Sequence, residues 1–156
     1  MAAINHILVA TDGSEGSCEA ASLAATFATM CNAKISVIAV NDEDALTLPA
    51  IIEAALPDTT PYTAFPKNDM RKVIEQHTEK EILPQTLKAI GETDGEVSTV
   101  QRWGHAAKEI CEFAEESGVD LIVIGRRGNS QFKQLFLGSV SSQVVAHAPC
   151  PVVVAK

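Results

Sequence analysis

Short apolar runs alternate with longer stretches of helical periodicity along the chain. Apolar runs that are bounded by turn residues are typical of strands buried on both faces of a sheet. Five segments have this strand character: His6–Ala10, Lys34–Val40, Gly95–Arg102, Asp120–Gly125 and Pro151–Val154. Apolar residues at helical spacing predict four main helices: Ser14–Asn32, Asp69–Ile90, Ala106–Ser117 and Ser139–His147.

Three residues mark where the predicted helices begin, break or end. Ser14 is expected to cap the first helix, because a serine hydroxyl can accept hydrogen bonds from the free N–H groups of the first turn. Pro84 should kink or interrupt the second helix, since proline lacks a backbone donor and clashes with the preceding turn. Gly118 follows the third helix as a typical glycine stop.

The alternation of strands and helices predicts an α/β fold, with an open parallel sheet and right-handed crossovers that place helices on both faces. Residues 1–156 are expected to form one domain, since domains most often have roughly 100–150 residues. The stretch at about residues 41–68 does not follow this order and is interpreted as a surface insertion with a short helical segment, Ala50–Leu56. It contains four of the seven prolines: Pro49, Pro57, Pro61 and Pro66.

Composition and charge limit the kinds of partner. Apolar residues make up 46% of the chain and aromatic residues only 4%, so the core is expected to consist of Val, Ile, Leu and Ala. The formal net charge is −8, and no dense run of Lys or Arg occurs, which argues against a nucleic-acid-binding protein. An anionic ligand would therefore depend on local backbone amides rather than on the overall field.

The cysteines and histidines show no metal-site pattern. No C-x-x-C spacing occurs, so Cys18, Cys31, Cys111 and Cys150 are expected to be small buried residues in a reducing compartment. The histidines lack ligand or triad spacing and are assigned to the surface or to helix packing. No signal segment is seen, and no apolar stretch approaches the roughly 20 residues of a membrane span, so we expect a cytoplasmic protein.

The residues that follow the strands are the candidates for ligand binding. In an open α/β sheet, ligands bind beyond the carboxyl ends of the strands, where the winding reverses. The first predicted strand leads into Ala10–Gly13, and the fourth leads into Gly125–Gly128. Nine residues further on, Gly138 and Ser139 begin the last predicted helix. We expect these segments to meet at one edge of the sheet.

The glycines in these segments suit a phosphate group. Gly125 and Gly128 lack a Cβ and allow a ligand to come close to the backbone. Gly138 leaves the amides of a helix start free for an anion, and the hydroxyls of Ser139 and Ser141 can add hydrogen bonds. The pattern matches neither the phosphate loop that ends in lysine nor the dinucleotide fingerprint.

Each candidate also has a purely structural interpretation. The glycines can be ordinary turn residues, and a role in capping the first helix is favoured for Asp12 taken alone. Arg126 and Arg127 can be solvated loop charges as well as phosphate contacts. The local pattern by itself therefore leaves ligand binding and a structural role both open.

The combined motifs resemble those of ATP-binding universal stress proteins. The glycine signature of that family is Gly-x-x-Gly, nine residues and then Gly-Ser, which corresponds here to Gly125, Gly128, Gly138 and Ser139. Three further segments are similar to the family: Ile7–Asp12, Asp120–Gly125 and Ala148–Val154. The resemblance extends over nearly the whole chain, with the insertion as its variable part.

The resemblance implies a Rossmann-like sheet of five parallel strands in the order 3-2-1-4-5 and a homodimer formed through the C-terminal strand, residues 151–155. It also implies ATP as the ligand, with Mg²⁺ or Mn²⁺ bound through the phosphates. By this resemblance, adenine contacts fall near Ala10, Thr11, Asp12 and Val40. Ribose and phosphate contacts fall at or near Gly125, Arg127, Gly128, Gly138, Ser139, Val140 and Ser141.

Three functions are open at this level. The leading hypothesis is a dimeric signalling module that binds ATP in a stress response. The first alternative is an enzyme that slowly hydrolyses ATP or phosphorylates itself, and the second is a structural dimer without nucleotide. Against efficient catalysis, no positioned lysine, general base or carboxylate pair follows the predicted strands.

Overall fold

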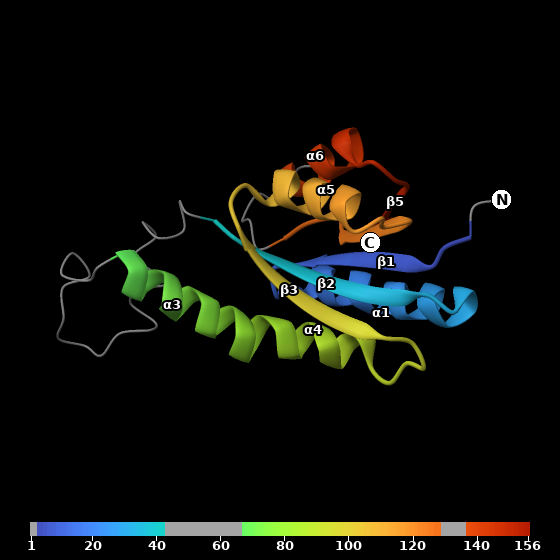
Figure 1. Ribbon diagram of the computed structural model, residues 1–156, viewed down its shortest axis with the longest axis horizontal. Coiled ribbons are helices and arrows are strands. Elements are labelled where there is room, and N and C mark those ends of the chain that lie inside the picture. The colour runs from blue at the N-terminus through green and yellow to red at the C-terminus, as the bar shows by residue number, and fades with distance from the viewer. Residues whose placement is uncertain (1–2, 43–66, 129–136) are drawn as a thin grey trace.

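A five-stranded parallel sheet forms the centre of the molecule. A computed structural model describes residues 3–42, 67–128 and 137–156 of the chain (Figure 1). The strand order is β3-β2-β1-β4-β5, as the resemblance implied. The strands are β1 His6–Thr11, β2 Lys34–Asn41, β3 Val97–Trp103, β4 Leu121–Gly125 and β5 Val152–Ala155. The helical segment expected at Ala50–Leu56 lies outside the described residues.

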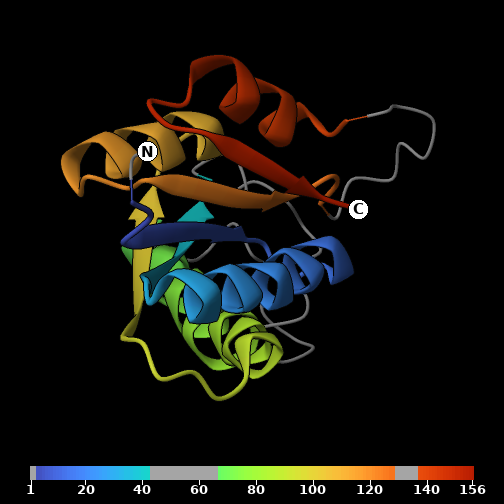
Figure 2. The same ribbon diagram turned by 90° about the vertical axis from the view of Figure 1, so that its right-hand side faces the viewer.

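Helices cover both faces of the sheet. Figure 2 shows α1 and α4 on one side of the sheet, and α5 and α6 on the other. The helical segments are α1 Glu15–Cys31, α3 Lys67–His77, η3 Thr78–Ile82, α4 Leu83–Ile90, α5 Ala106–Glu116 and α6 Ser139–His147. Each face therefore has its own hydrophobic core.

The two central strands explain the apolar runs in the sequence. Every residue of β1 and of β4 is buried. Side chains alternate along a strand, so Ile7 and Val9 pack toward α1, while Leu8 and Ala10 pack toward α5 and α6. Strands buried on both faces have no polar side, which accounts for the lack of apolar–polar alternation.

The start and stop signals predicted at Ser14 and Gly118 are confirmed, whereas the second predicted helix begins at Lys67 rather than Asp69. Ser14 caps α1, and its Oγ accepts a hydrogen bond from the backbone N–H of Ser17 at 3.3 Å. Gly118 follows α5 with a φ of +61°, in the left-handed region that glycine enters without steric cost. The third strand begins later than expected, at Val97 rather than Gly95, and ends at Trp103.

A π-helical turn just before Pro84 interrupts the second predicted helix. The segment η3 precedes the proline, and Leu83 donates its backbone N–H to the carbonyl of Thr78, five residues back. In an α-helix the ring of Pro84 would clash with the carbonyl of Lys80, and its missing N–H would leave that carbonyl without its donor. The wider turn relieves this conflict, so α3, η3 and α4 follow one another as one helical arm.

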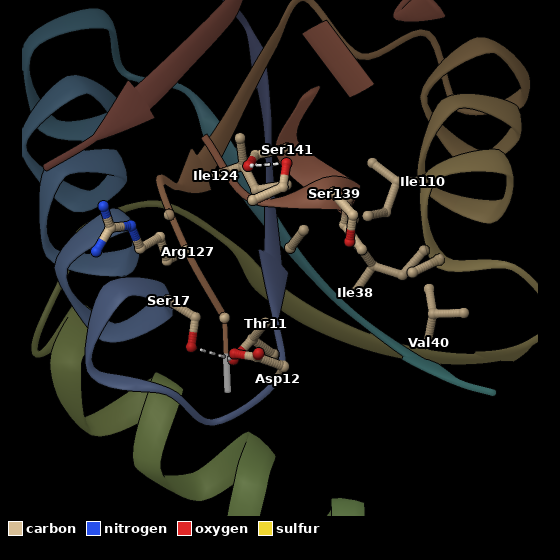
Figure 3. A pocket seen from close by; sticks show the side chains of 16 residues that line it. Thr11, Asp12, Ser17, Ile38, Val40, Ile110, Ile124, Arg127, Ser139 and Ser141 are labelled. Atoms are coloured by element: carbon tan, nitrogen blue, oxygen red, sulfur yellow. Dashed lines mark hydrogen bonds between the residues drawn. The ribbon is translucent and has the colours of Figure 1, made fainter. Parts of the chain in front are cut away.

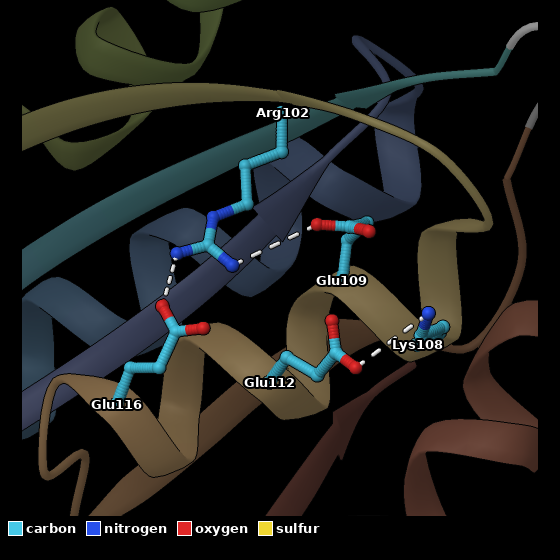
Figure 4. A network of polar contacts seen from close by, with 5 residues as sticks. All are labelled: Arg102, Lys108, Glu109, Glu112 and Glu116. Atoms are coloured by element: carbon cyan, nitrogen blue, oxygen red, sulfur yellow. Dashed lines mark hydrogen bonds and ion pairs between the residues drawn. The ribbon is translucent and has the colours of Figure 1, made fainter.

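A polar network ties α5 to the sheet edge (Figure 4). Arg102 of β3 forms ion pairs with Glu116 and Glu109, and its guanidinium lies 5.1 Å from the centre of the Phe113 ring. A hydrogen bond from Arg102 lowers the pKa of the Glu116 carboxyl. This network joins the edge strand β3 to α5, which packs on one face of the sheet.

Two expectations about single residues were wrong. His6 was assigned to the surface or to helix packing, but it lies in β1 and is buried. Its Nε2 lies 2.8 Å from Ser36 Oγ, and its Nδ1 lies 3.3 Å from the Ser117 carbonyl oxygen. The cysteines were expected to be buried, but Cys31 is exposed and the others are half-buried free thiols.

Candidate functional site

A cavity of about 220 Å³ opens at the carboxyl end of the sheet (Figure 3). It lies between the ends of the central strands and the start of α6. All the site residues expected from the sequence line it: Ala10, Thr11, Asp12, Val40, Gly125, Arg127, Gly128, Gly138, Ser139, Val140 and Ser141. The fold thus brings together segments that are more than a hundred residues apart in the chain.

Five lining residues were not expected: Ser17, Ile38, Ala106, Ile110 and Ile124. Two of them carry a signal in the strand pattern. Ile38 stands two positions before Val40 on the same face of β2, and Ile124 stands directly before Gly125 at the end of β4, so each adjoins an expected lining residue of its own strand. Ser17 lies in the first turn of α1, and no local pattern in the sequence assigned it to a cavity.

One wall of the cavity is apolar. Ile38, Val40 and Ile110 lie together on the same side of the cavity in Figure 3. They come from β2 and α5, and all three side chains take part in the core on the α5 and α6 face. A flat apolar group can therefore leave water on this side without losing hydrogen bonds.

Another part of the cavity lining, the start of α6, offers backbone amides. Ser142 is the first α6 residue whose N–H reaches the carbonyl of Gly138, at 2.9 Å. The N–H groups of Ser139, Val140 and Ser141 precede this bond, and Gly138 brings no capping side chain. Such a helix start attracts an anion through its free amides and its dipole.

A side chain at each of the three signature glycines would meet a different obstacle. A Cβ on Gly128 would clash with Asp12 Oδ2, and a Cβ on Gly138 would lie 3.3 Å from the Arg126 carbonyl oxygen. A Cβ on Gly125 would lie 2.6 Å from the backbone of Gly16. Gly125 is therefore required for the packing of β4 against α1, which the sequence did not indicate.

Asp12 stands at the rim, in the turn that joins β1 to α1. It is exposed, and its Oδ1 accepts a hydrogen bond from the backbone N–H of Ser14 at 3.0 Å. The cap of α1 is Ser14 itself, so the helix-cap interpretation of Asp12 is wrong. Among the lining residues of the described chain, Asp12 is the only carboxylate, and it has the means to accept hydrogen bonds from a ligand.

Two polar residues that were expected to face a ligand are directed elsewhere. Ser141 is buried, and its hydroxyl is within hydrogen-bonding distance of the carbonyl oxygens of Arg126, at 3.0 Å, and Gly138, at 3.1 Å. The guanidinium of Arg127 points toward α1, away from Ser139 (Figure 3). In this arrangement Ser141 holds the end of β4 against the start of α6.

Sequence comparison identifies the family. The profile of the universal stress protein family matches residues 3–156. The chain belongs to the universal stress protein family. This universal stress protein is 32% identical over 155 residues to the universal stress protein YxiE of Bacillus subtilis, a match that covers 97% of this chain and 99% of the relative. The expected family is therefore confirmed.

Solved structures show the same fold. The hypothetical protein MJ0577 of Methanocaldococcus jannaschii superimposes with a TM-score of 0.77 at 26% identity, covering 99% of this chain and 97% of the other. A universal stress protein in complex with cAMP gives a TM-score of 0.64 at 23% identity, covering 99% of each chain. The Archaeoglobus fulgidus protein in complex with dAMP gives 0.65 at 20% identity, covering 99% of this chain and all of the other.

No helix within the described residues is both long and apolar enough to cross a bilayer.

Proposed function

We propose that this universal stress protein binds ATP in the cavity at the carboxyl end of its sheet and acts as a nucleotide-dependent signalling module. One observation carries the proposal. The apolar wall at Ile38 and Val40 and the free amides at the start of α6 border the same cavity. A ligand with a flat apolar ring at one end and phosphates at the other matches both.

The arrangement gives each part of the nucleotide a partner. Adenine would lie against Ile38, Val40 and Ile110, with Asp12 beside it as an acceptor for a base or ribose donor. The phosphates would lie at the N–H groups of Ser139 and Val140. Two fold relatives contain the adenine nucleotides cAMP and dAMP, which supports the choice of an adenine base.

A divalent cation would be held mainly by the phosphates. Within the described part of the chain, no three His, Cys, Asp or Glu side chains form a cluster that suits a metal ion. Asp12 supplies a single carboxylate at the cavity rim. Mg²⁺ usually keeps several waters and binds through one or two carboxylates and substrate phosphates, so Asp12 and the phosphates together fit this ion.

We also propose a homodimer formed through β5, in the cytoplasm. Strand β5 pairs only with β4 among the described strands, and it is a short apolar edge of the sheet. An open edge of this kind favours pairing with a second copy of the strand. The four free thiols suit a reducing compartment.

Mass spectrometry tests the ligand directly. The protein is purified rapidly, denatured, and the released small molecules are identified and quantified against the protein. Retained ATP, or micromolar binding of added ATP in calorimetry, supports the proposal. Protein that retains no adenine nucleotide and shows no heat on addition of ATP would refute it. A phosphate-release assay on the same sample then decides between a binding module and a slow hydrolase.

A further inference from the structure

The helical arm formed by α3, η3 and α4 contacts the turn that bears Asp12. A Cβ on Gly13 would lie 3.3 Å from Ile82 Cγ1, so the Ile82 side chain covers this glycine. The hydroxyl of Thr86 lies 2.7 Å from the hydroxyl of Thr11. Ile82 ends the π-helical turn and Thr86 follows in α4, so one short stretch of the arm makes both contacts.

Thr11 links this contact to the cavity. Its Oγ1 lies 3.1 Å from Ser17 Oγ and accepts a hydrogen bond from the backbone N–H of Gly13 at 3.2 Å. Ser17 in turn donates to the carbonyl oxygen of Ser14 at 2.8 Å. Thr86 Oγ1 lies 2.7 Å from Thr11 Oγ1 and 3.0 Å from the Ile82 carbonyl oxygen. Either threonine can donate in the 2.7 Å contact, and the Thr86 hydroxyl connects Thr11 to the backbone of the arm.

These hydrogen bonds are made in the interior. Thr86 is fully buried, and Thr11 and Ser17 are 8% and 3% exposed. A buried hydroxyl that loses its partner is costly, so the hydrogen bond with Thr86 stabilises the position of Thr11. Both Thr11 and Ser17 also line the cavity, so a shift of either changes its wall.

The π-helical turn decides which residue reaches Thr11. The buried residues of the arm are Ile74, Thr78, Leu83, Thr86 and Ile90. Neighbours in this series are three or four residues apart, as in an α-helix, except across the π-helical turn, where Thr78 and Leu83 are five residues apart. A regular α-helix beyond residue 78 would direct residues near 82 and 85 to the sheet instead. The long Gln85 side chain would then take the place of the Thr86 hydroxyl.

We infer that Thr86 and Ile82 are positioning residues for the proposed nucleotide site, set in register by the π-helical turn. This inference rests on the proposed ATP site. The two residues hold the Thr11–Ser14 turn from behind, and the turn presents Asp12 at the rim. Neither residue belongs to the cavity lining, so both act through the turn.

The test uses Thr86→Val, which keeps the shape and removes the hydroxyl, with Thr86→Ser as the variant that retains the hydroxyl. Ser22→Ala is the matched control, because Ser22 links α1 to the Ala89 carbonyl at 2.9 Å, away from the turn. Amide hydrogen exchange of residues 12–17 is measured without nucleotide, and ATP affinity is measured by calorimetry. Thr86→Val should raise the exchange rate about tenfold and lower the ATP affinity about tenfold. Thr86→Ser and Ser22→Ala should match the wild type in both measurements.

Equal exchange and equal ATP affinity in Thr86→Val and Thr86→Ser would overturn the inference. If Thr86→Val does not fold, Ile82→Ala replaces it, because this change removes the contact with Gly13 without leaving a polar group unpaired. The same two measurements then decide. Wild-type protein that does not bind ATP would refute the proposed function, whereas the exchange data without nucleotide still show whether the arm holds the turn.

Discussion

Gly16 and Gly125 lie against each other with no room for a side chain between them. A Cβ on Gly125 would lie 2.6 Å from the carbonyl carbon of Gly16, and a Cβ on Gly16 would lie 2.7 Å from the Arg127 carbonyl oxygen. Both obstacles are backbone atoms, which cannot rotate away. The first turn of α1 thus packs directly on the end of β4, and this contact sets one side of the cavity.

Gly125→Ala is expected to destabilise the fold through this contact. Overpacking a tight interior typically costs about 1–3 kcal/mol, because backbone segments must move apart. Urea unfolding measures the loss of free energy, and Thr26→Ala on the exposed face of α1 is the control, with a change within about 0.5 kcal/mol. If Gly125→Ala unfolds at the same urea concentration as the wild type, the contact is not as tight as described.

Gly138→Val is expected to weaken ATP binding roughly tenfold or more while the protein stays folded. The reason is space, since Gly138 has a φ of −68° that valine also adopts, whereas the Cβ would already lie 3.3 Å from Arg126 O and Ser141 Oγ. Gln143→Val on the exposed side of α6 is the control for the helix. Calorimetry with ATP on both folded variants is the measurement, and unchanged affinity in Gly138→Val contradicts a phosphate position at this helix start.

Asp12→Ala should weaken ATP binding more than Asp69→Ala does. Asp12 stands at the cavity rim, whereas Asp69 lies in the first turn of α3 and does not line the cavity. Asp12→Asn keeps an oxygen for the Ser14 amide and separates loss of charge from loss of the turn. Equal affinities in Asp12→Ala and Asp69→Ala would show that Asp12 has only a structural role.

A comparison of Asp12→Ala with Ser14→Ala tests which residue caps α1. Because Ser14 caps α1, Ser14→Ala should lose about 0.5–2 kcal/mol of unfolding free energy. Urea unfolding of Ser14→Ala beside Asp12→Ala then shows which side chain caps the helix. A larger loss in Asp12→Ala than in Ser14→Ala would assign the cap to Asp12.

His6 should make the stability of the protein depend on pH. Burial first, and then the positive charge of Lys34, lower the pKa of His6 from its usual 6.5. The Ser117 carbonyl and the charges of Asp120 and Glu96 raise that pKa, but they do not outweigh burial. The folded protein therefore holds the His6 proton less tightly than the unfolded chain does.

The sign of the effect follows from linkage. The contribution of neutral His6 to stability is fully present above the unfolded pKa and is lost as the pH falls below it toward the folded value. Urea unfolding between about pH 7.5 and pH 5 should show a decrease that is smaller in His6→Gln. His147→Gln, at an exposed histidine, should keep the wild-type profile. A wild-type profile in His6→Gln would rule out this histidine as the cause.

Val154→Pro is expected to convert the proposed dimer to a monomer. Ile122 N–H donates to the Pro151 carbonyl and Arg126 N–H donates to the Ala155 carbonyl, so alternate β5 residues bond to β4. Val154 lies between residues that bond to β4, so its own N–H and C=O groups point away from β4 toward the open edge. Proline there removes an outward donor and leaves the pairing with β4 intact.

Light scattering at micromolar concentration measures the assembly, with Val154→Thr as the control that retains the N–H. Val153→Lys is less informative, because Val153 packs against the core on the α1 face and a lysine would also destabilise the monomer. A wild-type protein that is already monomeric refutes the dimer. A dimer that persists in Val154→Pro places the interface on another surface.

The extent of agreement between sequence and structure differs from element to element. The limits of α6 agree fully with the prediction, because its residues carry both a start signal at Gly138 and helical spacing. The limits of β3 differ by one or two residues, since this half-exposed edge strand has a weak apolar pattern. All expected site residues meet at the cavity, because parallel strands bring their carboxyl ends to one edge.

Sequence by itself determined the elements, their α/β order and the family, because apolar periodicity, turn residues and spaced glycines are local along the chain. Only the tertiary structure decided that Gly125 is required by Gly16, that Thr86 reaches Thr11, and that the Ser141 hydroxyl bonds to the backbone. It also decided the burial of His6. Each of these depends on contacts between segments distant in the chain, where close packing rather than local preference sets which atoms meet.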